Sequence, residues 1–407
     1  MKTRWLVLLA GSSACVSVIA VLGACASDGA TDGATADIDG VTFDGGPSEL
    51  SDGGADASDT PCADCEHFVE TCSSDVLCPN SPFDSNNAGD GGLSILTQIN
   101  VIRGRSASDV WAAGAVGSLA HFDGTSWAPS DSGTKESLKA LWLRDSSEVT
   151  FGSPDNVYIR GPAVEDAGAP SVGDWNAHAP SSMPWEYSPG TTTFVSAWAG
   201  PGAEWLWCAT TAVYPGTGTS GLWRLRLPPS GLPEIGNVVP DGVCTHLPCG
   251  QMLSIHGASV NALWAVGMTG ATIRITGADG DTPTMKAFDS QTWNALHGVW
   301  SVSETEAWSV GARGTIRHYT GDPVRWDVVT NAPTDVDLHA VWGSSPSDVW
   351  AVGDEAVVLH YDGATWSRVK IAGLNARRPK LTTVWMPAPG HVWIGGVGVI
   401  LSLGGKP

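Results

Sequence analysis

Short apolar stretches, separated by turn residues, recur along the chain from about residue 96. The clearest unit is VWGSSPSDVWAVGDEAVVLHYDGATW at 341–366. This unit predicts four strands, at Leu338–Trp342, Asp348–Val352, Ala356–Tyr361 and Thr365–Val369. Short polar links join them, and the Asp362-Gly363 pair between the last two strands is a favoured hairpin turn. Each unit is therefore expected to form a four-stranded antiparallel sheet.

Close copies of the unit lie at 101–127 and 299–326, and weaker copies begin near Leu141, Ala197, Ile255 and Val384. Seven such units of about 40–45 residues predict an all-β fold, a seven-bladed β-propeller of four-stranded antiparallel blades over residues 81–407. The last unit has no fourth strand of its own. We expect a segment between Ser81 and Ser94 to supply that strand and close the ring, with Pro82-Phe83 as its apolar contact.

Tryptophan occupies three columns of the repeat. The first column holds Trp111, Trp207, Trp264, Trp308, Trp350 and Trp393, with Thr150 in the second unit. The second column, eight residues upstream, holds Trp142, Trp198, Trp300, Trp342 and Trp385, with Arg103 and His256 in the remaining units. The third column holds Trp127, Trp175, Trp293, Trp326 and Trp366. We expect these rings to fill the gaps between neighbouring blades.

The pattern VG-x2-G-x-I-x-HYDG-x2-W resembles the bacterial BNR-type propeller repeat of photosystem assembly factors and of many secreted bacterial lipoproteins. It also resembles kelch repeats in its Tyr-then-Trp strand pair. The resemblance covers residues 96–407 and implies a propeller fold. Asp123-Gly124 and Asp362-Gly363 are adjacent pairs, whereas the sialidase Asp-box separates Asp from Gly by one residue, so the resemblance does not extend to sialidases.

The N-terminal 24 residues combine Lys2 and Arg4 with apolar runs, the layout of an export signal. The sequence Leu22-Gly23-Ala24-Cys25 resembles a bacterial lipobox, which implies lipidation of Cys25 and membrane attachment; a plain signal peptide is the alternative. Residues 25–60 contain eight Asp and one Glu without Lys or Arg, which predicts a disordered tether rather than a calcium loop. We expect an outer-membrane or cell-surface lipoprotein of a Gram-negative-type bacterium.

The spacing of the cysteines predicts disulfides, because closely spaced cysteines in exported proteins are usually oxidised. A Cys-rich segment at 61–80 contains Cys62, Cys65, Cys72 and Cys78, for which three pairings are open and a zinc site is the alternative. Cys244 and Cys249 flank a short loop that a disulfide could close. Cys208 is left over and is expected to be buried.

The chain of 407 residues carries 42 acidic and 21 basic residues, a formal charge of −21, which argues against nucleic acid as a partner. We find no motif for a nucleophile, a metal, a phosphate or another cofactor, so none is expected. Histidines at repeated positions are interpreted as packing residues. A monomeric propeller that binds or scaffolds a protein or glycan is favoured; the alternative is an exported hydrolase or lyase acting on polysaccharide.

Candidate ligand contacts are aromatic residues in inserted loops, namely Trp185, Tyr187 and Tyr214. These loops share a face of the propeller with the links between blades, and we expect a ligand to bind on that face. Arg377 and Arg378 belong to an acid-free basic run at 368–380 on the same face. That run is either a solvated loop or a contact for an anionic partner, which includes the protein's own acidic tether.

Overall fold

The computed structural model describes residues 64–80, 82–83, 92–161, 171–184, 187–212, 220–229, 231–236, 239 and 243–405. The chain divides into two units, Met1–Thr60 and Pro61–Pro407, and the strands and sites described belong to the second unit. The predictions made for the export signal, Cys25, the tether, Cys62, Trp185 and Tyr214 lie outside the described residues. Within the described ranges, no helix has the length and apolar character needed to cross a membrane.

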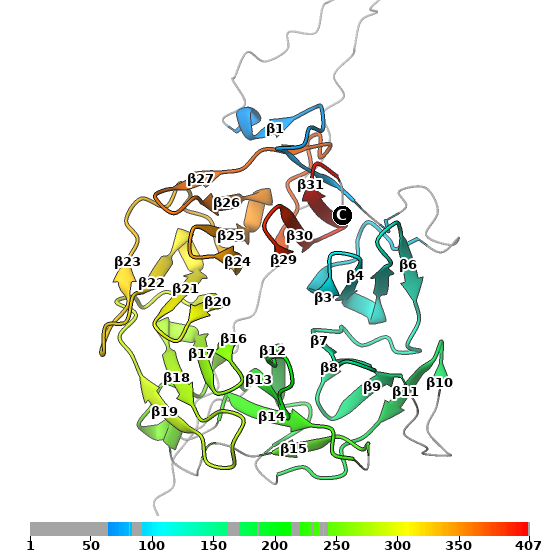
Figure 1. The fold of residues 1–407 in the computed structure, drawn as a ribbon, viewed down its shortest axis with the longest axis vertical. Helices are drawn as coiled ribbons and strands as arrows, with labels where there is room; N and C mark the ends of the chain where they lie inside the picture. The colour runs from blue at the N-terminus through cyan, green and yellow to red at the C-terminus, as the bar shows by residue number, and fades with distance from the viewer. Residues whose placement is uncertain are drawn as a thin grey trace, which may run out of the picture. The chain divides into compact units, whose positions relative to one another are not determined.

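The strands form a ring of sheets around a central axis (Figure 1). Six of the sheets are blades made of consecutive strands, and in each the first strand lies innermost. Their bounds are, blade by blade: β3 (Ile99–Ser106), β4 (Asp109–Gly114), β5 (Leu119–Phe122), β6 (Trp127–Ser130); β7 (Ala140–Leu143), β8 (Glu148–Ser153), β9 (Asn156–Arg160), β10 (Ser171–Val172), β11 (Trp175–His178); β12 (Thr192–Trp198), β13 (Trp205–Ala212), β14 (Leu222–Arg226), β15 (Glu234–Gly236); β16 (Met252–Ser259), β17 (Ala262–Gly267), β18 (Thr272–Thr276), β19 (Thr284–Ala287); β20 (Leu296–Ser303), β21 (Glu306–Gly311), β22 (Ile316–Tyr319), β23 (Asp327–Val328); β24 (Leu338–Ser345), β25 (Asp348–Gly353), β26 (Val358–Tyr361), β27 (Trp366–Arg368).

The remaining sheet joins both ends of the described chain. Its order is β1-β28-β2-β31-β30-β29, where β29 (Leu381–Ala388), β30 (His391–Gly396) and β31 (Val399–Leu403) are C-terminal. The outer strands are β1 (Phe68–Val69), β2 (Leu77–Pro79) and β28 (Ile371–Ala372). The prediction of seven alike four-stranded blades is therefore corrected: six blades are each one continuous stretch of chain, and this composite sheet has six strands.

The closing strand was also predicted at the wrong place. Strand β2 pairs antiparallel with β31, with Leu77 opposite Leu403, so the donor is Leu77–Pro79 and not a segment between Ser81 and Ser94. Leu77 is fully buried in the core of the composite sheet. Phe83, expected to supply the contact, packs partly buried against the neighbouring core and forms a bridge with Leu93.

Burial within a blade follows from its position in the ring. Strand β25 is buried from Val349 to Gly353 because both faces of a middle strand contact neighbouring blades. The outermost strand β23 is exposed at both residues. The hydrophobic cores accordingly lie between blades: one joins Trp207 of β13 to Ile273 of β18 in the next blade.

Tryptophans of the first and third columns meet in four of these interfaces. The ring of the second strand contacts the ring of the next blade's outer strand edge to face, with centroids 4.9–5.6 Å apart. The pairs are Trp111–Trp175, Trp264–Trp326, Trp308–Trp366 and Trp393–Trp127. Trp293 does not follow the column: it lies in the link after β19 with 88% of its surface exposed.

Short 3₁₀ turns follow the second strand of four blades and fasten each blade to the next. They are η2 (Ala115–Gly117), η4 (Met268–Gly270), η5 (Ala312–Gly314) and η6 (Asp354–Ala356). In η5, the amide of Gly314 donates to Val336 O in the following link at 2.8 Å. Gly314 has φ +64°, and an added Cβ would lie 2.2 Å from Thr334 O, so only glycine fits this approach. Two further 3₁₀ turns are η1 (Cys65–His67) and η3 (Val243–Thr245).

Disulfides join Cys72 to Cys78 and Cys244 to Cys249, which confirms that these cysteines are oxidised. Cys65 is also disulfide-bonded. The Cys72–Cys78 pair resolves the three pairings left open for the Cys-rich segment. Cys208 has a free thiol and is fully buried in β13, as expected.

Candidate ligand-binding site

The axis of the ring is a narrow channel between the first strands of the blades. A cavity of about 160 Å³ lies along it. Its lining is polar where the first strands begin: Asn100, Lys139, His297, His339 and Thr382. His339 bonds Asp354 at 2.8 Å, and its ring stacks on that of His297 with centroids 5.3 Å apart. Histidines at one repeated position therefore do meet when that position lies on an innermost strand.

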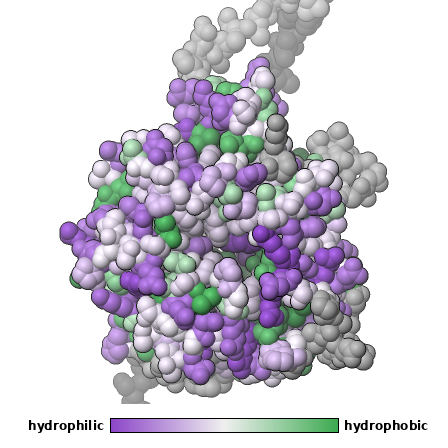
Figure 2. Space-filling view, viewed as in Figure 1, coloured by the Kyte–Doolittle hydropathy of each residue, from purple (hydrophilic) through white to green (hydrophobic). Residues whose placement is uncertain are grey.

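The channel widens at its other end into a cavity of about 810 Å³. This mouth lies where the first strands end and where they link to the second strands, at 143–147 and 199–203. The surface in Figure 2 is hollowed near the centre of the ring. The predicted ligand loops belong to the opposite face, so this cavity lies on the face that was not expected to bind.

Four tryptophans of the second column line the mouth: Trp142, Trp198, Trp342 and Trp385. Each sits near the end of a first strand, so the second column reaches the channel rather than filling only the gaps between blades. Arg103 and His256, which replace tryptophan in that column, line both the channel and the mouth. The departures from the repeat are thus the residues that place hydrogen-bonding groups at the axis.

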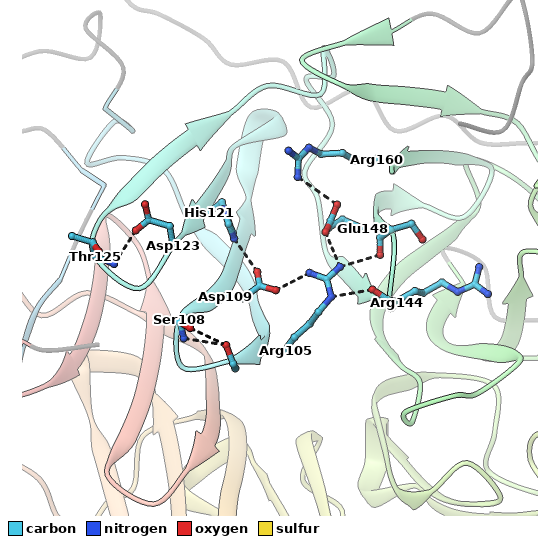
Figure 3. Close-up of polar contacts among 11 residues, drawn as sticks. Arg105, Ser108, Asp109, His121, Asp123, Thr125, Arg144, Glu148 and Arg160 are labelled. Carbon is cyan, nitrogen blue, oxygen red and sulfur yellow. Dashed lines mark hydrogen bonds and ion pairs between the residues drawn. The ribbon is translucent and has the colours of Figure 1, made fainter. Parts of the chain in front are cut away.

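Arg105 is neutralised on one side of the mouth by two carboxylates (Figure 3). Its guanidinium bonds Asp109 at 2.8 Å and Glu148 at 2.6 Å, and its Nε donates to Arg144 O at 2.9 Å. Burial alone would raise the pKa of Asp109, but hydrogen bonds from Arg105 and His121 outweigh it and hold the pKa below its usual value. These carboxylates fasten the first two blades together and are occupied by structural partners.

Two further groups at the mouth are held by aromatic rings. The guanidinium of Arg144 lies 5.0 Å from the ring centroid of Trp142. His256 packs edge to face on Trp342, and its Nδ1 accepts the backbone N–H of Ser301 at 3.1 Å. Burial, reinforced by the charge of Arg103, lowers the pKa of His256 well below its usual value. The neutral ring then carries its proton on Nε2.

The predicted contacts on the other face have structural roles in this fold. Tyr187 is buried, with its ring edge to face on Trp223, so it is not an exposed loop aromatic. Arg377 donates to Val397 O and Gly398 O at 3.2 Å and so holds the turn of the composite sheet. Burial of Tyr187 within this packing raises its pKa above the usual range.

Arg378 is engaged by the N-terminal segment. Its guanidinium lies 3.4 Å from the ring centroid of Phe68 and 3.1 Å from Asp64, which Arg368 also approaches at 3.9 Å. The hydrogen bond from Arg378 is the main reason that the pKa of Asp64 is lowered. Part of the basic run thus meets an acid of the Cys-rich segment 61–80, not of the tether at 25–60 that was considered from the sequence.

Within the described ranges, no group of three or more His, Cys, Asp or Glu side chains could hold a metal ion. Histidines of the third strands have structural partners instead. His121, His318 and His360 bond Asp109, Glu306 and Asp348 at 2.8–3.1 Å and lie against the tryptophan of the adjacent second strand.

No family model matches the chain, and no curated protein matches it. Solved structures do resemble it. YCF48 from Cyanidioschyzon merolae aligns with TM-score 0.55 and 15% identity over 75% of this chain and 94% of that chain. A structure of YCF48 bound to a D1 peptide aligns with TM-score 0.54 and 14% identity over 75% and 91%. The WD40 propeller domain of Doa1 aligns with TM-score 0.52 and 10% identity over 75% and 91%. The chain is a β-propeller. At these identities the likeness shows the fold alone, so the site is argued from its own residues.

Proposed function

We propose that this protein is an envelope-anchored binding module whose propeller takes a protein segment into the mouth of its channel. The observation that carries the proposal is the 810 Å³ cavity, with its tryptophan walls and arginines. Aromatic walls with a few placed polar groups are the usual make-up of a ligand site. Asp109 and Glu148, beside this cavity, are paired with Arg105. A structural neighbour was solved with a bound peptide.

The finer parts of the proposal come from the sequence. We take the repeat to be of the BNR type and the protein to be monomeric. Lipidation at Cys25 would attach it to the outer membrane or cell surface, and the acidic residues 26–60 would hold the propeller away from the lipid surface. A glycan ligand is the other partner class, and the experiment below separates it from a peptide.

The test selects peptides from a displayed random library on residues 26–407 and then measures their affinity for two variants. Ser146→Trp fills the mouth from an exposed position in its lining. Ser126→Trp adds the same ring at an exposed link outside that lining and is the matched control. We expect Ser146→Trp to weaken binding by about tenfold or more, because the ring occupies the volume that the ligand needs. Peptides that bind both variants equally, or a library that yields none while a glycan array binds, would refute the proposal.

A further inference from the structure

Arg103 is one of the arginines that contact an aromatic ring. It lines both the channel and the mouth, so it stands at the waist between them. Its guanidinium lies 4.5 Å from the ring centroid of Trp342, and its one hydrogen bond goes from Nη1 to Ile102 O at 2.7 Å. In the described part of the chain, no carboxylate forms an ion pair with it. Most of its donors therefore remain available to a ligand.

Comparison with two similar arginines shows what is missing. Arg224 also lies over a tryptophan, Trp205, at 3.9 Å, but it donates to Gly280 O and is stabilised by nearby acids that include Asp281. Arg378 lies over Phe68 and pairs with Asp64. A cation taken out of water without such a partner is costly. Burial lowers the pKa of Arg103 to about 10, and no neighbouring carboxylate offsets that effect.

The surroundings of Arg103 favour an anion. The charged residues lining the mouth are Arg103, Arg105, Arg144 and one acid, Asp145. Because Asp109 and Glu148 neutralise Arg105, Arg103 and Arg144 remain against the one acid Asp145. His256, also at the waist, is neutral and carries a proton on Nε2, which makes it a second donor beside Arg103.

We propose that the waist of the channel is a carboxylate-binding subsite, in which Arg103 receives an acidic side chain of a peptide segment that enters through the mouth. This proposal rests on the function proposed above and narrows its ligand. A planar guanidinium can hold both oxygens of a carboxylate, and Trp342 fixes the plane of that fork. The ligand would supply the negative charge that the described residues do not provide at this point.

The test uses a fluorescein-labelled oligoglutamate peptide and an oligoglutamine peptide of equal length, with binding followed by fluorescence anisotropy. We expect the wild type to bind oligoglutamate and to prefer it over oligoglutamine. Arg103→Gln should weaken that binding by about tenfold or more, because a buried charge pair is lost. Arg103→Lys keeps the charge but lacks the planar guanidinium, so its affinity for oligoglutamate should lie between those of the wild type and Arg103→Gln. Arg325→Gln, with the same charge change at an exposed position far along the chain, is the control.

Folding of each variant is checked by thermal denaturation, so that a loss of binding is compared only among folded proteins. The subsite is refuted if the wild type does not bind oligoglutamate at a peptide concentration of about 1 mM, at which even a weak complex would form. It is also refuted if oligoglutamine binds equally well, or if Arg103→Gln behaves like Arg325→Gln. If neutral peptides bind the wild type and Ser146→Trp weakens that binding, the proposed function is supported and this subsite is refuted.

Discussion

Tryptophans that look alike in the repeat occupy two kinds of environment. Trp264 and Trp308, on second strands, are buried between blades. Trp142 and Trp342, near the ends of first strands, border the channel mouth. The repeat predicts that each position is equivalent in every blade, but it does not say what lies beside the innermost strand. On the axis that neighbour is a channel, and this is why a column expected to fill blade contacts also lines a site.

Single residues that leave the repeat could be interpreted only in part from the sequence. Arg103 and His256 were visible as departures from a tryptophan column, and this signal could have located the axis site. Trp293 was assigned to a buried column, but the fourth strand of its blade ends at Ala287 and the ring lies exposed in the link that follows. Tyr187 was expected to be exposed because its segment is long and polar, yet the ring lies against Trp223. Spacing alone does not distinguish these outcomes.

The buried His256 gives the protein a pH-dependent stability. Because burial lowers the pKa of His256 in the folded state, the unfolded chain binds a proton more readily below the usual value of 6.5. His256 therefore does not reduce the unfolding free energy above that pH, and it reduces the unfolding free energy progressively as the pH falls below it. We expect this residue to cost about 1.4 kcal/mol of unfolding free energy at about pH 5.5 relative to pH 7.5.

Urea denaturation at the two pH values measures this cost in the wild type and in His256→Gln, which keeps an acceptor for the Ser301 amide. The variant should lose less stability on acidification, by about the same 1.4 kcal/mol. His246→Gln, at an exposed position, should retain the full pH dependence of the wild type. Equal pH dependence in His256→Gln and the wild type would contradict the assignment.

At the scale of elements, the strands within a unit were predictable and the closure of the ring was not. Strands of the reference unit fall within a few residues of their predicted bounds, because apolar alternation and Asp-Gly turns specify them locally. Strand β2 has only the residues Leu77, Cys78 and Pro79, which are too few to show a periodicity. Its pairing with β31 depends on contacts between opposite ends of the chain, and no local pattern encodes them.

The closing strand is expected to stabilise the whole propeller. Leu77→Ala removes a fully buried side chain from the core of the composite sheet, so it should lower the free energy of unfolding by about 2–5 kcal/mol. Leu96→Ala is the matched control: Leu96 is 82% exposed, and its truncation should cost less than about 0.5 kcal/mol. Urea denaturation monitored by circular dichroism compares them. Similar losses in the two variants would show that β2 does not contribute to the core.

At the scale of the whole molecule, the net charge of the chain does not describe the charge at the channel mouth. The formal charge of −21 argues against a general positive field, but it is an average over the chain. The ring brings Arg103, Arg105 and Arg144 together at one mouth, although they come from two blades and are separated along the sequence. This grouping of arginines in an acidic protein therefore emerges from topology, and composition could not have revealed it.

The last prediction concerns the attachment of the whole molecule to a membrane. Two or more acyl chains give stable anchoring, since each buried CH₂ contributes about 0.8 kcal/mol, whereas a single chain binds only weakly. If Cys25 is lipidated, the wild type expressed in a Gram-negative host should partition into detergent, and Cys25→Ser should be a soluble protein or an uncleaved precursor. Cys15→Ser, within the export signal but outside the lipobox, is the control and should partition like the wild type. Detergent partitioning of Cys25→Ser at the wild-type level would contradict lipidation at this cysteine and leave the propeller without the proposed anchor.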